Sequence, residues 1–200
     1  MKKILHIISS PRGAASYTIR LGNAIIDKLQ LAYADSTVKE FSLVEERFQH
    51  LEEAHLNAFF APVESRTPEN LVAIEHSDAA IAEIMAADII VLGVPLYNFG
   101  VPSNLKAWID HISRVGVTFK YDQNGPEGLI KNKKLYIAFS AGGVYSEGPM
   151  ASYDNAVPYL KSVFGFLGIT DITVVRVEGT NIPGIQDNAL AKGIDSIIVN

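Results

Sequence analysis

Residues 87–100 read ADIIVLGVPLYNFG, an apolar run that passes directly into a loop rich in aromatic residues. The stretch 89–94 holds no polar residue, and this is the pattern of a strand buried on both faces of a parallel sheet. The loop that follows, PLYNFG (95–100), carries more ring surface than a chain reversal needs. We therefore expect a buried parallel strand here, with a planar molecule lying against the loop at its end.

Strand-like and helix-like segments alternate on both sides of this run. Apolar runs predict four more strands, at residues 2–8, 37–42, 133–140 and within 169–179. Helical spacing and capping residues predict helices at 17–33, 43–60, 67–86, 101–115, 151–166 and from 184 to about the end of the chain. Residues 117–130 alternate around Asn124-Gly125 and predict a hairpin. Five strands separated by helices predict a doubly wound α/β fold with a parallel sheet, formed by one domain over residues 1–200.

Composition excludes several classes of function. The chain has 200 residues, a net charge of −5 and no cysteine, so we expect neither nucleic-acid binding nor thiol chemistry. No apolar run approaches the roughly 18 residues that a membrane helix needs, and we expect no membrane association. The N-terminal apolar stretch is too short for a signal peptide. These features favour a cytoplasmic protein.

Three loops are expected to meet at one edge of the sheet. They are SSPRGAAS (9–16), PLYNFGVPSN (95–104) and SAGGVYSEGP (140–149), and each follows a predicted strand. In doubly wound sheets, ligands bind beyond the carboxyl ends of the strands. The first loop has hydroxyls and a helix N-terminus, which suit a phosphate, and the third has glycines that allow close approach of a flat ligand. Together the loops predict a site for a phosphorylated planar ligand such as flavin mononucleotide (FMN).

The sequence resembles the FMN-dependent NADH:azoreductases, which are relatives of the NAD(P)H:quinone reductases and have a flavodoxin-like fold. The resemblance extends over essentially the whole chain, and three motifs carry it: PLYNFGVPSNLKAWID, SRVGVTFKYDQNGPEGLI and FSAGG. It implies a sheet with the strand order 2-1-3-4-5. It also implies bound FMN, NADH or NADPH as the electron donor, and quinones, azo compounds or nitroaromatics as acceptors. Hydride would pass through flavin N5 in a two-electron, ping-pong cycle.

The same resemblance assigns residues to the site. Ser10, Ser16, Tyr17 and Thr18 would bind the phosphate end of FMN. The flavin ring would lie against Pro95, Leu96, Tyr97, Asn98 and Phe99, with its polar edge at Ser140, Ala141, Gly142 and Gly143. Tyr17 and Ala141 depart from the family, in which glutamine and arginine are common at these places. Phe99, Phe119 and Tyr121 would form the substrate wall, within a homodimer whose active sites use both subunits.

Two other functions stay open from the sequence. A flavodoxin-like electron carrier would share the fold, although the 117–130 excursion argues against it. A phosphoester hydrolase could use the first loop to hold the phosphate of its substrate. A hydrolase with Ser140 as nucleophile is disfavoured, because FSAGG lacks the leading glycine of a nucleophile elbow. We expect no metal site: His50 and His55 have the wrong spacing for a helical zinc pair and are expected at the surface, whereas His6 is expected in the core.

Overall fold

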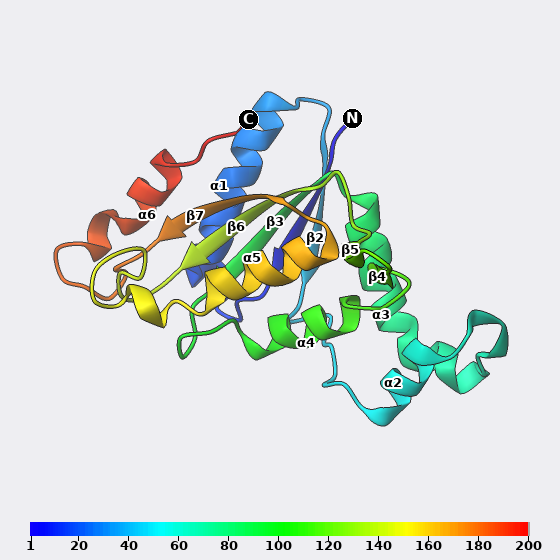
Figure 1. Cartoon of the computed structure of the whole chain (residues 1–200). Helices are drawn as coiled ribbons and strands as arrows, with labels where there is room; N and C mark the ends of the chain where they lie inside the picture. Colours follow the sequence, from blue (N-terminus) through cyan, green and yellow to red (C-terminus); the bar gives the residue numbers. More distant parts are fainter. Residues whose placement is uncertain (200) are drawn as a thin grey trace.

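A five-stranded parallel sheet forms the centre of the computed structural model, which describes residues 1–199 (Figure 1). Its order is β2-β1-β3-β6-β7, and counted along the chain this is the predicted order 2-1-3-4-5. The strands are β1 (Lys3–Ile8), β2 (Thr37–Ser42), β3 (Ile89–Pro95), β6 (Lys134–Ser140) and β7 (Asp171–Val177). All seven residues of the central strand β3 are buried, as its apolar sequence predicts. The predicted doubly wound, flavodoxin-like architecture is confirmed.

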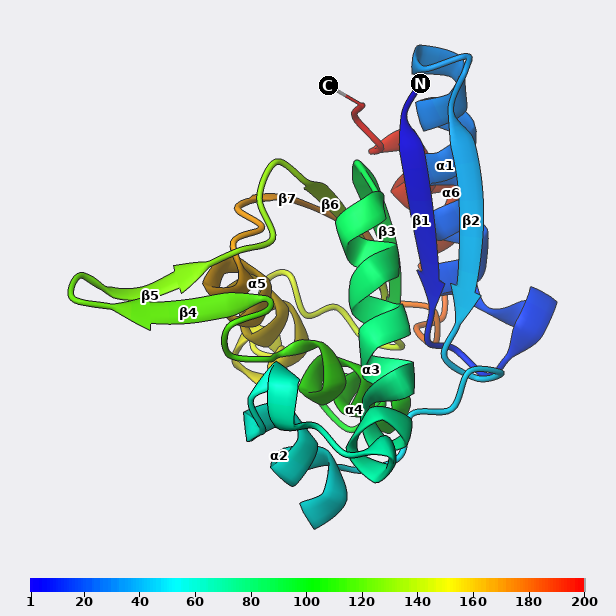
Figure 2. The same ribbon diagram turned by 90° about the vertical axis from the view of Figure 1, so that its right-hand side faces the viewer.

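Helices cover both faces of the sheet (Figure 2). One face is covered by α1 (Tyr17–Ala32) and α6 (Gln186–Asp195). The other face is covered by α3 (Pro68–Ala86), α4 (Ser103–Ile112) and α5 (Ala156–Leu167), and α2 (Glu53–Phe60) packs against α3. Three short 3-10 helices complete the fold at Gly13–Ala15, Val63–Ser65 and Ala151–Tyr153. Within residues 1–199 no helix is both long enough and apolar enough to cross a membrane.

Capping residues fix where two of the long helices begin. The Ser16 hydroxyl accepts a hydrogen bond from the Ile19 amide at 3.4 Å and caps α1. Thr67 and Asn70 form a reciprocal capping box at the start of α3, directly before Pro68. A cap that satisfies one orphan amide typically contributes about 1 kcal/mol. Both starts agree with the sequence prediction.

The predicted helix over residues 43–60 is wrong in its first half, because only Glu53–Phe60 is helical. The preceding residues are held by tertiary contacts instead. The carbonyl of Gln49 lies 3.0 Å from Nε2 of His111, and the Phe48 ring lies 5.4 Å from that histidine ring. These contacts come from a distant part of the chain, and helical periodicity cannot reveal them.

His55 was expected at the surface but is buried. Its Nδ1 accepts a hydrogen bond from the Glu52 amide at 3.1 Å and so caps α2, while its ring packs edge-on against His111 at 4.9 Å. His6 lies in the core, as predicted.

The predicted helix over 151–166 is two helices. The chain breaks at Asp154, whose carboxylate accepts hydrogen bonds from the amides of Ala156 and Val157 and thereby starts α5. Pro158 lies in the first turn of α5, where its missing amide proton removes no helical hydrogen bond. The last helix is likewise shorter than expected and ends at Asp195.

The predicted hairpin at 117–130 is present as β4 (Phe119–Asp122) and β5 (Gly125–Gly128), which project from the body of the molecule (Figure 2). Its base packs closely on the end of α5. A side chain at Gly128 would overlap the backbone of Leu167 and Gly168. Glycine is therefore required where the hairpin meets the helix.

Candidate functional site

Loops from four of the five sheet strands converge on one cavity at the carboxyl edge of the sheet. The cavity has a volume of about 220 Å³. Its lining residues lie at the ends of strands, in the loops that follow them or at the start of α1, and they are Ser10, Arg12, Ser16, Tyr17, Pro95, Leu96, Tyr97, Ser140, Ala141, Gly142, Thr180 and Asn181. A cleft of about 280 Å³ between β2 and α3 is larger, but it lies at the side of the sheet and receives none of these loops. The convergence of strand ends makes the first cavity the candidate functional site.

The loop between β1 and α1 presents hydrogen-bond donors to this cavity. Ser16 caps α1, and its hydroxyl lies 2.9 Å from the hydroxyl of the fully buried Thr18. The first-turn amides of α1, those of Tyr17 and Thr18 among them, have no partner within the helix, and the helix dipole adds partial positive charge there. The Arg12 side chain lines the same cavity. This end of the cavity suits an anion such as a phosphate.

The loop after β3 turns back within four residues. The amide and carbonyl of Tyr97 exchange hydrogen bonds with those of Gly100, both at 3.0 Å. The two residues between them, Asn98 and Phe99, have φ values of +49° and +66°. This is a type I′ turn, and a left-handed conformation costs an ordinary side chain about 1–2 kcal/mol. Such strain in a phenylalanine points to a role for the ring, which is 43% exposed at the rim of the site.

The loop after β6 forms the opposite side of the cavity and is tied to the loop after β7. The amides of Gly179 and Asn181 donate to the carbonyls of Gly143 and Gly142 at 2.9 and 3.0 Å. A Cβ atom at Gly142 would come within 2.7 Å of the side-chain Nδ2 of Asn181. The backbone here can thus approach a flat ligand closely, and it does so on a rigid support.

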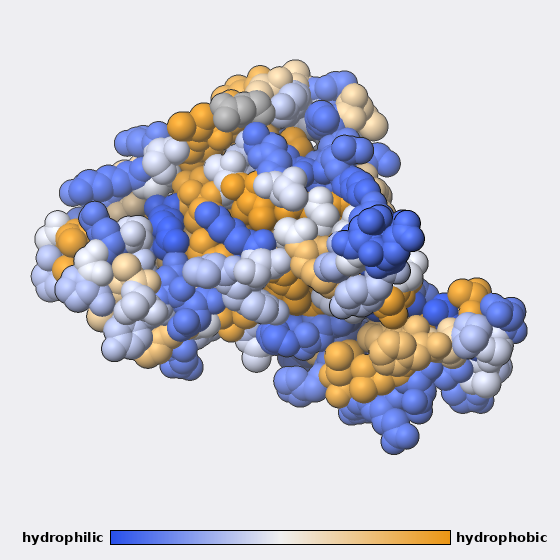
Figure 3. Space-filling model, viewed as in Figure 1, coloured by the Kyte–Doolittle hydropathy of each residue, from blue (hydrophilic) through white to orange (hydrophobic). Residues whose placement is uncertain are grey.

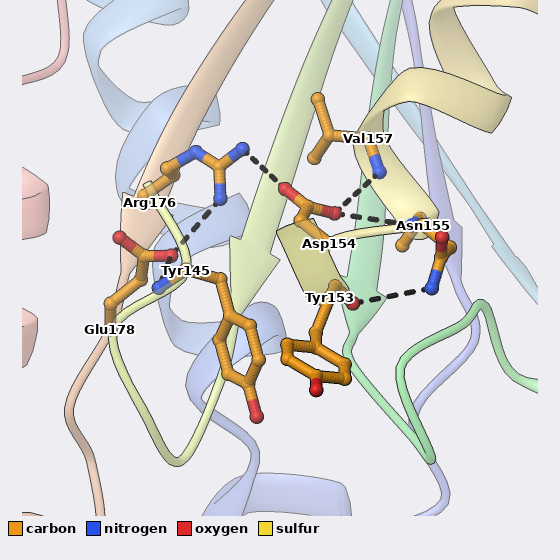
Figure 4. Close-up of polar contacts among 8 residues, drawn as sticks. Tyr145, Tyr153, Asp154, Asn155, Val157, Arg176 and Glu178 are labelled. Atoms are coloured by element: carbon orange, nitrogen blue, oxygen red, sulfur yellow. Dashed lines mark hydrogen bonds and ion pairs between the residues drawn. The ribbon is translucent and has the colours of Figure 1, made fainter. Parts of the chain in front are cut away.

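An aromatic cluster stands beside the cavity. The Phe99 ring centroid lies 6.4 Å from that of Tyr145 and 5.2 Å from that of Tyr153. Both tyrosines belong to the loop between β6 and α5, and the Asn155 amide at its end donates to the Phe99 carbonyl at 3.2 Å. The two tyrosine rings lie next to each other in Figure 4. The site therefore has a polar floor and an aromatic wall.

The structure brings most of the residues expected from the sequence together. Nine of them line the cavity: Ser10, Ser16, Tyr17, Pro95, Leu96, Tyr97, Ser140, Ala141 and Gly142. Thr18 lies beneath it and orients Ser16, while Asn98 and Phe99 form the turn at its rim. Gly143 contributes its carbonyl to the support from Gly179. All thirteen cofactor residues thus lie in the three loops around one cavity or, for Tyr17 and Thr18, in the first turn of α1.

Phe119 and Tyr121 lie apart from this cavity within one chain. They are in the β4–β5 hairpin, where the Phe119 ring contacts Tyr121 at 5.7 Å and Phe166 of α5 at 4.7 Å. Neither lines the cavity, and Tyr121 is 65% exposed. Their assignment to the substrate wall stays a prediction that requires a second subunit.

Several residues of the site were missed from the sequence. Thr180 and Asn181 follow β7, and the rule that ligands meet strand ends would have indicated them had it been applied to the fifth strand. Tyr145 and Tyr153 lie in a long loop with no pattern that reveals contact with Phe99. Among residues 1–199, no group of three or more histidine or acidic side chains is arranged to hold a metal ion.

Fold and site together define a doubly wound α/β protein with a donor-rich loop at the start of α1 and an aromatic cluster at the carboxyl edge of its sheet. The chain belongs to the family with a flavodoxin-like fold, whose model matches residues 2–198.

Named relatives and solved structures narrow this class. The chain is 50% identical over 176 residues to an FMN-dependent NADH:quinone oxidoreductase of Aromatoleum aromaticum, covering 88% of this chain and 87% of the relative. It is 40% identical to a protein of the same name from Mesorhizobium japonicum, covering 98% of this chain and 96% of the relative. An azoreductase crystal structure from Bacillus anthracis has a TM-score of 0.90 at 33% identity, covering 98% of this chain and 96% of that one.

A second B. anthracis structure, of an FMN-dependent NADH-azoreductase in complex with FMN, has a TM-score of 0.85 at 26% identity, covering 98% of this chain and 97% of that one. These proteins resemble this chain over nearly their whole length.

Proposed function

We propose that this protein is an FMN-dependent NADH:quinone oxidoreductase that also reduces azo compounds. The observation that carries the proposal is the convergence of the phosphate-type loop, the Tyr97–Gly100 turn and the Ser140–Gly143 backbone on one cavity. The names of the relatives at 40–50% identity support it, as does the FMN complex of a structural neighbour. Neither an electron carrier nor a phosphoester hydrolase is favoured by these relatives.

The residues present fit FMN. Ser10, Ser16 and the first-turn amides of α1 would hold the phosphate, with Arg12 adding charge. The backbone of residues 95–97 would face the ring, and Gly142, which has no room for a side chain, would approach its polar edge. FMN held there would supply the hydride-transfer chemistry between NADH and the acceptor.

The protein itself has three tasks in this cycle. The α1 end fixes the phosphate and so positions the ring, and backbone amides near Gly142 and Gly143 favour negative charge on the ring's polar edge. The departures at Tyr17 and Ala141 leave the backbone contacts available. Phe99 would offer its face to a planar acceptor. Quinones, azo compounds and nitroaromatics all present such a face. NADPH is the alternative electron donor to NADH.

We further propose a homodimer with active sites shared between subunits. Apolar side chains are exposed over α2 and the start of α3, at the lower right of Figure 3, and these are Leu56, Phe60, Val63, Leu71 and Val72. A patch of this kind is typical of an interaction surface. The hairpin with Phe119 and Tyr121 projects from the body, so a second copy could receive it.

A nicotinamide donor favours the cytoplasm as the location of the protein. Each subunit would work as one domain over residues 1–200.

Anaerobic stopped flow tests the central proposal. The purified protein should be yellow, or become yellow with added FMN, and NADH should bleach its flavin absorbance within the time of one turnover. Addition of a quinone should then restore the colour. A protein that binds FMN but is bleached by neither NADH nor NADPH is an electron carrier instead, and one that stays colourless with FMN contradicts the flavin site.

A further inference from the structure

The loop between β6 and α5 is held at both ends by buried carboxylates. At its start, the Tyr145 amide donates to Oε1 of Glu178 at 3.0 Å. At its end, Oδ1 of Asp154 accepts the amides of Ala156 and Val157 at 3.1 and 3.0 Å (Figure 4). The residues between, from Ser146 to Tyr153, are exposed. The middle of the loop packs against no core, so the loop is held by the contacts near its two ends, which include the packing of Tyr145 on the core and the hydrogen bond from the Asn155 amide to the Phe99 carbonyl.

One arginine joins the two ends. Nη2 of Arg176 lies 2.7 Å from Oδ2 of Asp154, and its Nη1 lies 3.0 Å from Oε1 of Glu178 (Figure 4). The two carboxylate side chains are only 6% and 9% exposed, and that of Arg176 is 24% exposed. Ion pairs shielded in this way are screened far less by solvent than surface pairs. The two carboxylates are held by two different nitrogens of one planar guanidinium, whose fork fixes the direction of both contacts.

The arginine itself is fixed from below. Its guanidinium lies 4.7 Å from the ring centroid of Phe139, its partner in the β6–β7 register and the residue directly before Ser140. Stacking on an aromatic ring limits the orientations of the fork. Arg176 thus connects the sheet, just below the cavity, to both ends of the loop.

The loop held in this way carries Tyr145 and Tyr153, the two rings beside Phe99. We propose that Arg176 is a positioning residue for the electron acceptor: by joining Asp154 to Glu178 it holds the two tyrosines beside Phe99, and these three rings form the wall against which an aromatic acceptor stacks. The proposal rests on the proposed quinone reductase function and adds a determinant of acceptor choice. Acceptors with two fused rings overlap this wall more than a single-ring benzoquinone does.

The test compares variants with acceptors of different size. Arg176→Met keeps the length of the stem and removes the charge, and Lys161→Met, which removes an exposed charge on α5, is the matched control. We expect Arg176→Met to raise KM for a naphthoquinone about five- to tenfold and KM for benzoquinone less than about twofold, since an aromatic pair contributes about 1 kcal/mol. The rate of flavin bleaching by NADH should be unchanged. Equal effects on both quinones would overturn the proposal.

A direct measurement of the loop separates positioning from general weakening. Glu147 lies in its exposed middle, and a glutamate-specific protease should cut after it faster in Arg176→Met than in the wild type or the control. Unchanged cleavage would contradict the positioning role. Should Arg176→Met fold poorly, Arg176→Gln serves the same two measurements, because its neutral amide forms neither ion pair.

The wall is tested independently through Tyr153, which is 48% exposed and can be changed without disturbing the core. Tyr153→Ala should raise KM for the naphthoquinone selectively, and Tyr153→Phe should restore it. If Tyr153→Ala has the same KM for naphthoquinone as the wild type, Tyr153 is not part of the wall and the proposal is overturned. If wild-type flavin is not reduced by NADH, the proposed function fails on its own, and naphthoquinone binding to the FMN-loaded protein, measured by fluorescence quenching, still decides between the variants.

Discussion

At the scale of single residues, Phe99 and His6 both occupy unfavourable surroundings, the first through backbone strain and the second through burial. Phe99 occupies a left-handed conformation that glycine or asparagine would adopt more easily. His6 is fully buried with neither ring nitrogen hydrogen-bonded, beside Gly22, where a side chain would come within 2.5 Å of its Nε2. Sequence alone placed Phe99 in the site and His6 in the core. It could not show the strain, because backbone dihedrals depend on the closed turn.

Because Phe99 has a left-handed conformation, glycine should be more stable than alanine at this position, the opposite of the usual order. Phe99→Gly and Phe99→Ala both remove the ring, but only glycine relieves the left-handed conformation. We expect the glycine variant to be more stable than the alanine variant by about 1 kcal/mol in urea unfolding. Both should lose affinity for naphthoquinone to a similar extent. An alanine variant as stable as the glycine variant would show that the turn relaxes.

Buried histidines predict that the protein loses stability in mild acid. Burial lowers the pKa of His6, with Glu40 opposing the shift, and burial also lowers the pKa of His111. Below about pH 6.5 the unfolded chain takes up protons that the folded chain refuses, so the free energy of unfolding falls as pH falls, by at most roughly 1.4 kcal/mol per pH unit for each group.

Urea unfolding between pH 7.5 and 5.0 measures this slope. His6→Gln should reduce it, and His50→Gln, at an exposed position, should not. Equal slopes in the wild type and His6→Gln would contradict the assignment.

At the scale of elements, local sequence patterns predicted all five strands of the sheet and the α-helices around it. Contacts between distant parts of the chain determine the segments that were predicted wrongly. Strand β2 was predicted from the alternation of its apolar and polar residues, and the starts of α1 and α3 from their capping residues Ser16 and Thr67. Residues 43–52 read as helix, yet contacts with α3 and α4 hold them in another conformation. The three strand-end loops of the site were predictable because topology alone brings them together. The contacts of Tyr145 and Tyr153 with Phe99 were not predictable, since the later part of the third loop is held by an ion-paired network.

The contact between the hairpin and α5 predicts opposite effects for two glycines. Gly128→Ala would force the hairpin away from Leu167 and Gly168, and we expect a loss of more than about 2 kcal/mol, comparable with overpacking of a core. Gly165→Ala, in α5 with free space around it, should stabilise by about 0.5–1 kcal/mol through helix propensity. Thermal unfolding of both variants checks this. A neutral Gly128→Ala would mean that the hairpin is not fixed on α5.

At the scale of the whole molecule, one chain holds an incomplete set of the predicted site residues. The cavity and Phe99 lie at the carboxyl edge of the sheet, while Tyr121 extends into solvent on the hairpin. The exposed apolar patch on α2 and α3 provides a surface for a second copy. Two-fold symmetry would give both subunits the same exchange of hairpins. The proposed shared site would explain why the hairpin residues do not reach their own cavity.

Mixing two variants, each lacking one ring of the proposed shared site, tests this sharing at low naphthoquinone concentration. If each site uses Phe99 of one subunit and Tyr121 of the other, a hybrid of Phe99→Ala and Tyr121→Ala subunits contains one site with both rings and one with neither. Random reassembly makes half of the dimers hybrid, so about a quarter of the wild-type naphthoquinone turnover should return after the variants are unfolded together and refolded. Each variant refolded alone is the control and should stay low. Absence of recovery, in a sample that sedimentation shows to be dimeric, would mean that each subunit completes its own site and that Tyr121 serves only the interface.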